Sequence, residues 1–374
     1  MKIKNISLRK MKLKLKEPFQ TSFGTQTERE FIIVEVQGEN HVGYGECVVN
    51  SAPLYNEETV KTAWHIMEDF LIPRIYSQSE INHPDEVSQL FKPFRRNNMA
   101  KAAIEGAIWD LFAKENQMTL AKALGGSKKS IDVGISIGIQ PSVQELVRVV
   151  GKYVNEGYKR IKIKIKPGTD VEALKAVRKQ YPMIQMMADA NSAYTIDDIE
   201  TFKELDKLNL MMIEQPLAHD DIIDHAKLQA QIKTPICLDE SIHSLEDAKK
   251  AIELGSCKII NLKIGRVGGL TESKKIHDYC NEKGIPLWCG GMLESGIGRA
   301  HNIAITSLSN FTLPGDTASS SRYWDEDIVH PEVTAVEGVI QIPTSPGIGY
   351  APQQELLDKY TEEVINVGEG YYVK

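Results

Sequence analysis

The sequence predicts an α/β protein in which a parallel (β/α) barrel follows a smaller α+β unit. From residue 131 onward, short strand-like runs recur, and they start near residues 132, 160, 184, 210, 235, 258, 285 and 310. Neighbouring starts are 23 to 28 residues apart, and helical patterns such as "DVEALKAVRKQY" lie between them. Eight strands that alternate with helices at this spacing are typical of a closed barrel. A doubly wound open sheet is the alternative, but no Gly-x-Gly-x-x-Gly follows the first strand.

The N-terminal third of the chain follows a different order. Strand patterns such as "FIIVEVQG" come first, and helical patterns such as "MAKAAIEGAIWDLFAKENQ" come after them, which indicates an α+β unit. We therefore assign residues 1–126 to an α+β domain and residues 127–324 to the barrel. The turn-rich tail, residues 325–374, closes with a short helical pattern and is expected to return to the N-terminal domain.

Composition and charge argue against several classes of protein. The formal net charge is -7 and the pI is near 5.8, whereas nucleic acid binding usually needs a basic face. The chain has no run of about 18 apolar residues. Its five cysteines are odd in number and show no Cys-x-x-Cys spacing, which fits a reducing compartment. We expect a cytoplasmic protein that binds neither nucleic acid nor a membrane.

Three acidic residues end three successive predicted strands: Asp189 in "MMADAN", Glu214 in "MMIEQP" and Asp239 in "CLDES". Each is 25 residues from the next, so the three side chains are expected side by side at the barrel mouth, where active sites lie. Three packed anions need a cation, and carboxylate oxygens without His or Cys favour Mg²⁺ or another divalent ion such as Mn²⁺. The alternative is that each acid only caps the next helix, which explains one acid better than three in register.

Lysines alternate with isoleucines in "YKRIKIKIKPGTD", residues 158–170. A strand turns alternate side chains to opposite faces, so we expect Lys162 and Lys164 to face the barrel interior. Lys263 ends the sixth predicted strand, which lies opposite the second in an eight-stranded ring. A substrate carboxylate on the metal would place its α-carbon between Lys164 and Lys263, with Lys164 as base and the deeper Lys162 as electrostatic neighbour. A solvent-exposed edge strand is the alternative.

Together these motifs resemble the o-succinylbenzoate synthase and N-succinylamino acid racemase family, in the muconate lactonizing enzyme subgroup of the enolase superfamily. The matching motifs are Lys-x-Lys at 162–164, "IEQP" at 213–216, "DES" at 239–241 and "NLKIGRVGG" at 261–269. The resemblance implies a modified (β/α)7β barrel of the TIM type, with a capping domain built from the N-terminal region and the C-terminal tail. Dipeptide epimerases, a similar family, carry Asp-x-Asp where Asp316 is followed here by Thr and Ala.

The resemblance also implies which residues contact the substrate. "PFQTSFGT" at 18–25 is similar to a mobile specificity loop, and the loop from Gly290 to Ser295 is similar to a second contact loop. The implied substrate contacts are Ser136, Asn191, Gly291, Met292, Phe23 and Gly24.

The activity implied by the resemblance is that of o-succinylbenzoate synthase, a carbon-oxygen lyase of menaquinone biosynthesis. Lys164 would remove the proton α to the carboxylate, giving an enediolate stabilised by Mg²⁺ and Lys263, and loss of water would follow. Racemisation of N-succinylamino acids is the alternative, since it needs the same two lysines, and one protein can have both activities. A noncatalytic barrel that binds carboxylate ligands is the third hypothesis. We expect a small-molecule carboxylate substrate and a homo-oligomer.

Overall fold

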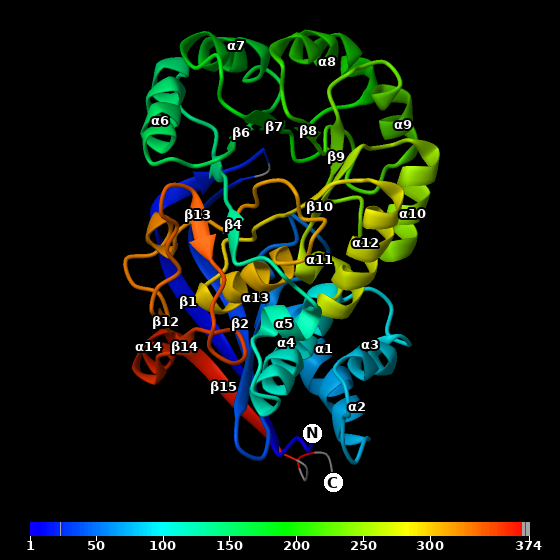
Figure 1. Cartoon of the computed structure of the whole chain (residues 1–374), viewed down its shortest axis with the longest axis vertical. Helices are drawn as coiled ribbons and strands as arrows, with labels where there is room; N and C mark the ends of the chain where they lie inside the picture. The colour runs from blue at the N-terminus through cyan, green and yellow to red at the C-terminus, as the bar shows by residue number, and fades with distance from the viewer. Residues whose placement is uncertain (23, 369–370, 372–374) are drawn as a thin grey trace.

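The computed structural model describes residues 1–22, 24–368 and 371. Two assemblies of strands organise them, an antiparallel sheet and a ring of parallel strands. Figure 1 shows the parallel strands β6, β7 and β8 near one end of the molecule and both chain termini near the other. The predicted α/β class, with a TIM-like barrel and an α+β capping domain, is confirmed. None of the described helices combines the length and the apolar character needed to span a bilayer.

The antiparallel sheet has the strand order β15-β1-β2-β3. In order along the chain, its first three strands are β1 (Asn5–Gln20), β2 (Thr25–Gln37) and β3 (Val42–Cys47). The lysine-rich run of β1 buries Met11, Leu13 and Leu15, whereas the lysines between them reach the surface, as expected for a half-exposed strand.

Five α-helices follow β3 in the chain, with a π-helix, Met67–Leu71, between the first two. They are α1 (Val60–Ile66), α2 (Ile72–Tyr76), α3 (Asp85–Phe91), α4 (Asn98–Glu115) and α5 (Leu120–Leu124). α4 packs closely on β3, and Gly43 and Gly45 make this approach possible. A Cβ added at either glycine would lie 2.0 Å from a backbone carbonyl oxygen of α4. α4 also contacts two barrel helices, so it joins the cap to the barrel.

The parallel ring contains seven strands in sequence order, from β5 to β11. They are β5 (Ile135–Ile137), β6 (Ile161–Lys164), β7 (Met186–Asp189), β8 (Ile213–Glu214), β9 (Ile236–Leu238), β10 (Ile259–Leu262) and β11 (Leu287–Cys289). The segment near residue 310, predicted as the eighth strand, occupies that place in the ring but forms no regular strand, and its Pro314 lacks the N–H that a regular ladder needs. The segment still closes the ring through bridges from Phe311 to β11 and from Gly315 to Val133. The arrangement agrees with the (β/α)7β form.

Helices cover the outside of the ring. They are α6 (Val143–Asn155), α7 (Val171–Gln180), α8 (Ile199–Leu205), α9 (Ile223–Gln229), α10 (Leu245–Leu254), α11 (Ile264–Val267), α12 (Leu270–Lys283) and α13 (Gly296–Thr306). α10 and α12 end before Gly255 and Gly284, which take the left-handed conformation. Inside the ring, an apolar floor of Met187, Met212, Cys237, Ile259 and Trp288 lies below the strand ends.

The tail is built of short strands and one helix. β12 (Val329–His330) pairs with β14 (Ala351–Pro352), and β13 (Val339–Gln341) pairs with β4 (Ser130–Asp132) at the start of the barrel. α14 (Gln354–Tyr360) then leads into β15 (Thr361–Gly368), which pairs with β1. The sequence predicts that the tail closes with a helix. This prediction is wrong, because the tail closes with the strand β15. The domain boundaries after residues 126 and 324 stay predictions.

Candidate active site

The three predicted metal ligands stand on adjacent strands. Asp189 and Glu214 end β7 and β8 and are direct partners in the register, and Asp239 follows β9 by one residue. All three carboxylates are buried. Burial raises the pKa of Glu214 well above its ordinary value, and the negative charges of Asp189 and Asp239 raise it further. Burial is the largest of these causes, so the buried position itself disfavours the charged form of this carboxylate.

Each of these acids is turned towards a basic side chain. Lys162 Nζ lies 3.3 Å from Asp189 Oδ2 and 3.2 Å from Glu214 Oε2. Among the described residues, no three His, Cys, Asp or Glu side chains are oriented to hold one ion as they stand. The donor set nevertheless fits a hard divalent cation, because three buried carboxylates end or directly follow neighbouring strands at one edge of the ring.

Lys164 and Lys263 stand on β6 and directly after β10, with β7, β8 and β9 between these two strands in the ring. Lys164 Nζ donates hydrogen bonds to Asp189 Oδ2 at 2.6 Å and to Asn191 Oδ1 at 2.7 Å. Lys263 Nζ donates to Asp239 Oδ2 at 2.9 Å. Both lysines line one cavity of about 80 Å³. The alternative of a solvent-exposed lysine strand does not hold, since Lys162 and Lys164 are both buried.

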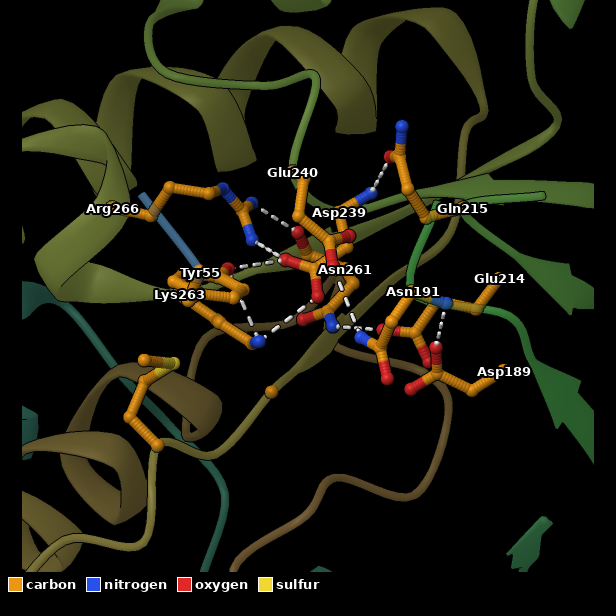
Figure 2. A network of polar contacts seen from close by, with 12 residues as sticks. Tyr55, Asp189, Asn191, Glu214, Gln215, Asp239, Glu240, Asn261, Lys263 and Arg266 are labelled. Atoms are coloured by element: carbon orange, nitrogen blue, oxygen red, sulfur yellow. Dashed lines mark hydrogen bonds and ion pairs between the residues drawn. The ribbon is translucent and has the colours of Figure 1, made fainter. Parts of the chain in front are cut away.

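The surroundings of Lys263 hold it in the charged form. Burial lowers the pKa of this lysine, but the carboxylate of Asp239 and the other polar neighbours more than reverse that effect, and its pKa is raised well above the ordinary value. The hydroxyl of Tyr55 donates to Asp239 Oδ1 at 2.9 Å and accepts from Lys263 Nζ at 3.1 Å. Figure 2 shows Asp239 between Tyr55, Lys263 and Arg266, which also pairs with its carboxylate.

Sequence reasoning did not identify Tyr55, Arg266 or Asn261 as part of this network. Asn261 Nδ2 donates to Glu214 Oε1 at 2.6 Å, and its place two residues before Lys263 on a strand could have revealed that it faces inward. Tyr55 comes from a loop of the capping domain, far away in the sequence, and no spacing pattern predicts its contact.

Asp316, noted in the sequence only as a departure from the epimerase pattern, lies at the closing segment of the ring. Its two carboxylate oxygens pair with Arg160 Nη2 and Lys162 Nζ, each at 2.7 Å. Burial lowers the pKa of Lys162, but Asp316 is the strongest of the groups that raise it, and the net shift is upward. Lys162 is therefore held by three carboxylates.

Four of the six implied substrate contacts line the cavity: Ser136, Asn191, Gly291 and Met292. Gly24 is not among the described residues that line it, and Phe23 lies outside the described residues. Elsewhere in the predicted specificity loop, Phe19 and Thr21 line the cavity. Ser22 Oγ donates to the backbone oxygen of Asn191 at 3.2 Å, so this loop lies against the barrel mouth.

Glu240 contacts Asn191 from the side opposite Lys164. Its Oε1 accepts from Asn191 Nδ2 at 3.0 Å, so Asn191 connects Glu240 to Lys164. Burial and the charge of Asp239 raise the pKa of Glu240 to about 7.

Comparisons with known proteins show the family to which the chain belongs. Residues 3–125 match the family "Mandelate racemase / muconate lactonizing enzyme, N-terminal domain", and residues 145–356 match "Enolase C-terminal domain-like". The o-succinylbenzoate synthase of Geobacillus stearothermophilus is 58% identical over 96% of both chains. The N-succinylamino acid racemase of Thermus thermophilus is 47% identical over 96% of this chain and 98% of its own.

Two solved structures extend these similarities. An enolase superfamily member from Listeria innocua has a TM-score of 0.96 and 44% identity, and the match covers 99% of this chain and 100% of that one. A dipeptide epimerase from Enterococcus faecalis, complexed with Mg and the dipeptide L-Leu-L-Tyr, has a TM-score of 0.86 and 26% identity, with 94% and 100% covered.

Proposed function

Since the chain belongs to the enolase superfamily, and within it to the o-succinylbenzoate synthase and N-succinylamino acid racemase family, we propose that it makes o-succinylbenzoate. The reaction is the dehydration of 2-succinyl-6-hydroxy-2,4-cyclohexadiene-1-carboxylate, a carbon-oxygen lyase step of menaquinone biosynthesis. The observation that carries the proposal is the pair of buried lysines, Lys164 and Lys263, that line one cavity beside three carboxylates. The similarity to o-succinylbenzoate synthases at 50 to 58% identity supports it.

Lys164 is proposed as the general base, which in its neutral form takes the proton α to the substrate carboxylate. Lys263 is proposed as the electrostatic partner on the other face of the substrate. Its raised pKa suits this role, because an ammonium group stabilises the negative charge that develops when the proton leaves. Departure of the β-hydroxyl as water then completes the aromatic ring.

We propose Mg²⁺, or another divalent ion such as Mn²⁺, as the cofactor, with Asp189, Glu214 and Asp239 as its ligands. When bound, the ion supplies positive charge that stabilises the carboxylate end of the substrate as electron density builds up there. The burial of all three carboxylates on or directly after neighbouring strands supports this assignment. Ser136, Asn191, Gly291 and Met292, together with Phe23 and Gly24, are proposed as substrate contacts.

The test is a dehydration assay of the purified protein with magnesium chloride, in which o-succinylbenzoate is measured directly. Lys164→Ala and Lys263→Ala should each lower kcat by about 10² to 10⁴. Lys166→Ala is the matched control, since Lys166 follows the same strand but is not among the described residues that line the cavity. Full turnover by either cavity variant would remove that lysine from the mechanism.

Racemisation of N-succinylamino acids is the second candidate. It is favoured by the same two lysines, placed on strands across the ring, and by the racemases among the relatives at 47 and 44% identity. Wild-type protein in D₂O should incorporate deuterium at the α-carbon of N-succinylphenylalanine. Racemisation without dehydration would make the racemase the main activity, and the noncatalytic hypothesis requires that neither reaction occurs.

A further inference from the structure

One arginine of the cavity has no acidic partner in the part of the chain that the structure describes. Arg299 lies in the first turn of α13, lines the cavity of Lys164 and Lys263, and is only 2% exposed. Its Nε donates to the backbone oxygen of Glu294 at 2.9 Å, and its Nη1 donates to the backbone oxygen of Ala318 at 2.5 Å. Within the described residues, no carboxylate pairs with this guanidinium and no group accepts a hydrogen bond from its Nη2.

The other cations of the cavity differ from Arg299 in this respect. Lys162, Lys164 and Lys263 each contact at least one carboxylate within 3.3 Å. The nearby carboxylate of Glu294 accepts instead from the backbone N–H of Met292 at 2.8 Å. A buried charge without a counter-ion is unfavourable, so the guanidinium of Arg299 favours an anion inside the cavity.

The position of Arg299 suits a group far from the reacting carbon. α13 follows β11, and Ala318 follows the segment that closes the ring, whereas the three acids stand on β7, β8 and next to β9. A substrate whose reacting carboxylate lies at the acids would extend towards the closing segment. There, Arg299 stacks on Tyr323 at 4.9 Å, and Phe19 packs against the same ring with centroids 6.4 Å apart. Ser136, on neighbouring β5, adds a buried hydroxyl to which no described residue is hydrogen-bonded.

We propose that Arg299 is a specificity-determining residue that binds the terminal carboxylate of the succinyl group. The inference rests on the proposed function and deepens it, because the substrates of the synthase and of the racemase share this group. A planar guanidinium whose Nη2 has no acceptor among the described residues matches a carboxylate in geometry and charge. The aromatic rings of Tyr323 and Phe19 would cover the methylene groups that lead to it.

The experiment compares two ligands by calorimetric titration in the presence of magnesium chloride. The first is o-succinylbenzoate, and the second is 2-butyrylbenzoate, which has a methyl group in place of the terminal carboxylate. We expect wild-type protein to bind the first about 10- to 100-fold more tightly. Arg299→Gln should reduce this preference to less than threefold while leaving the affinity for 2-butyrylbenzoate within about twofold.

Arg322→Gln is the matched control. Arg322 stacks on the same Tyr323 ring at 5.4 Å but is not among the described residues that line the cavity. It should keep the wild-type preference. A preference that survives R299Q, or an equal weakening of both ligands, overturns the inference and leaves Arg299 a purely structural role. Failure of wild-type protein to bind either ligand would instead contradict the proposed function.

A second variant guards against misfolding. If circular dichroism shows R299Q to be unfolded, Arg299→Lys is measured in its place. It keeps the charge but loses the planar fork, so the preference for o-succinylbenzoate should fall by at least about threefold. An undiminished preference in R299K overturns the inference.

Discussion

Replacing Asp316, which lines the cavity, by asparagine tests whether its two buried ion pairs stabilise the barrel. The change keeps the shape of the side chain and removes its charge. Both carboxylate oxygens lie 2.7 Å from a basic group, on Arg160 and Lys162, and all three side chains are at most 7% exposed. Removing one member of a buried ion pair typically costs about 3 to 5 kcal/mol.

We expect the lower end of that range, a loss of about 3 kcal/mol in the free energy of unfolding. Lys162 keeps its contacts with Asp189 and Glu214, and Arg160 keeps a hydrogen bond to the backbone oxygen of Pro314 at 3.0 Å. These remaining partners limit how far the two cations are left uncompensated.

The assay is urea unfolding followed by circular dichroism, with wild type, Asp316→Asn and Asp358→Asn compared in one buffer. Asp358 is the control, because it also pairs with an arginine, Arg9, at 3.0 Å, but its side chain is 59% exposed. The exposed pair should contribute about 1 kcal/mol or less. Equal losses in the two variants would refute the reasoning that burial makes the Asp316 pairs important.

Four further outcomes are expected. Burial raises the pKa of Glu105 to about 7, so the folded protein favours the protonated form of this side chain. The free energy of unfolding should therefore fall by up to about 3 kcal/mol as the pH rises from about 4.5 to 7. Urea unfolding of Glu105→Gln over the same pH range should show a smaller fall. A steeper fall in the variant would contradict this assignment. Tyr55→Phe removes the hydroxyl shared by Asp239 and Lys263, and steady-state kinetics should show kcat reduced about tenfold; an unchanged kcat would exclude a functional role for the hydroxyl. EDTA should abolish dehydration and added Mg²⁺ should restore it, whereas activity that persists in EDTA would rule out the proposed cofactor. Gly45→Ala should destabilise the protein by at least about 2 kcal/mol in thermal or urea unfolding, because the new Cβ would meet a backbone carbonyl of α4.

Much of the candidate site could be predicted because the barrel repeats along the chain. A spacing of 25 residues corresponds to one βα unit, so Asp189, Glu214 and Asp239 had to reach the same edge of the ring once the barrel was assumed. The alternation of Lys162 and Lys164 with isoleucines similarly predicted which side chains face inward. The spacing of the βα units thus determines the edge of the ring at which a residue lies, and the alternation along a strand determines whether its side chain points into the ring or outward.

The parts that the sequence did not reveal depend on long-range contacts. Tyr55 reaches Asp239 from another domain, and Asp316 meets Arg160 across the closure of the ring. No spacing rule relates such residues, because their proximity depends on how whole domains dock. Strand β15 was missed for the same reason, since its short, half-exposed run is defined by its pairing with β1.

The pairing of β1 with β15 also affects the order in which the molecule is assembled during translation. Ser7 Oγ donates to Asn366 Oδ1, and these residues are 359 positions apart. A nascent chain therefore emerges with an unfinished sheet, which stays incomplete until β15, which ends at Gly368, has been synthesised. Every strand of the ring is made before that moment, so Lys164 and Lys263 can take their places before the antiparallel sheet of the cap is complete.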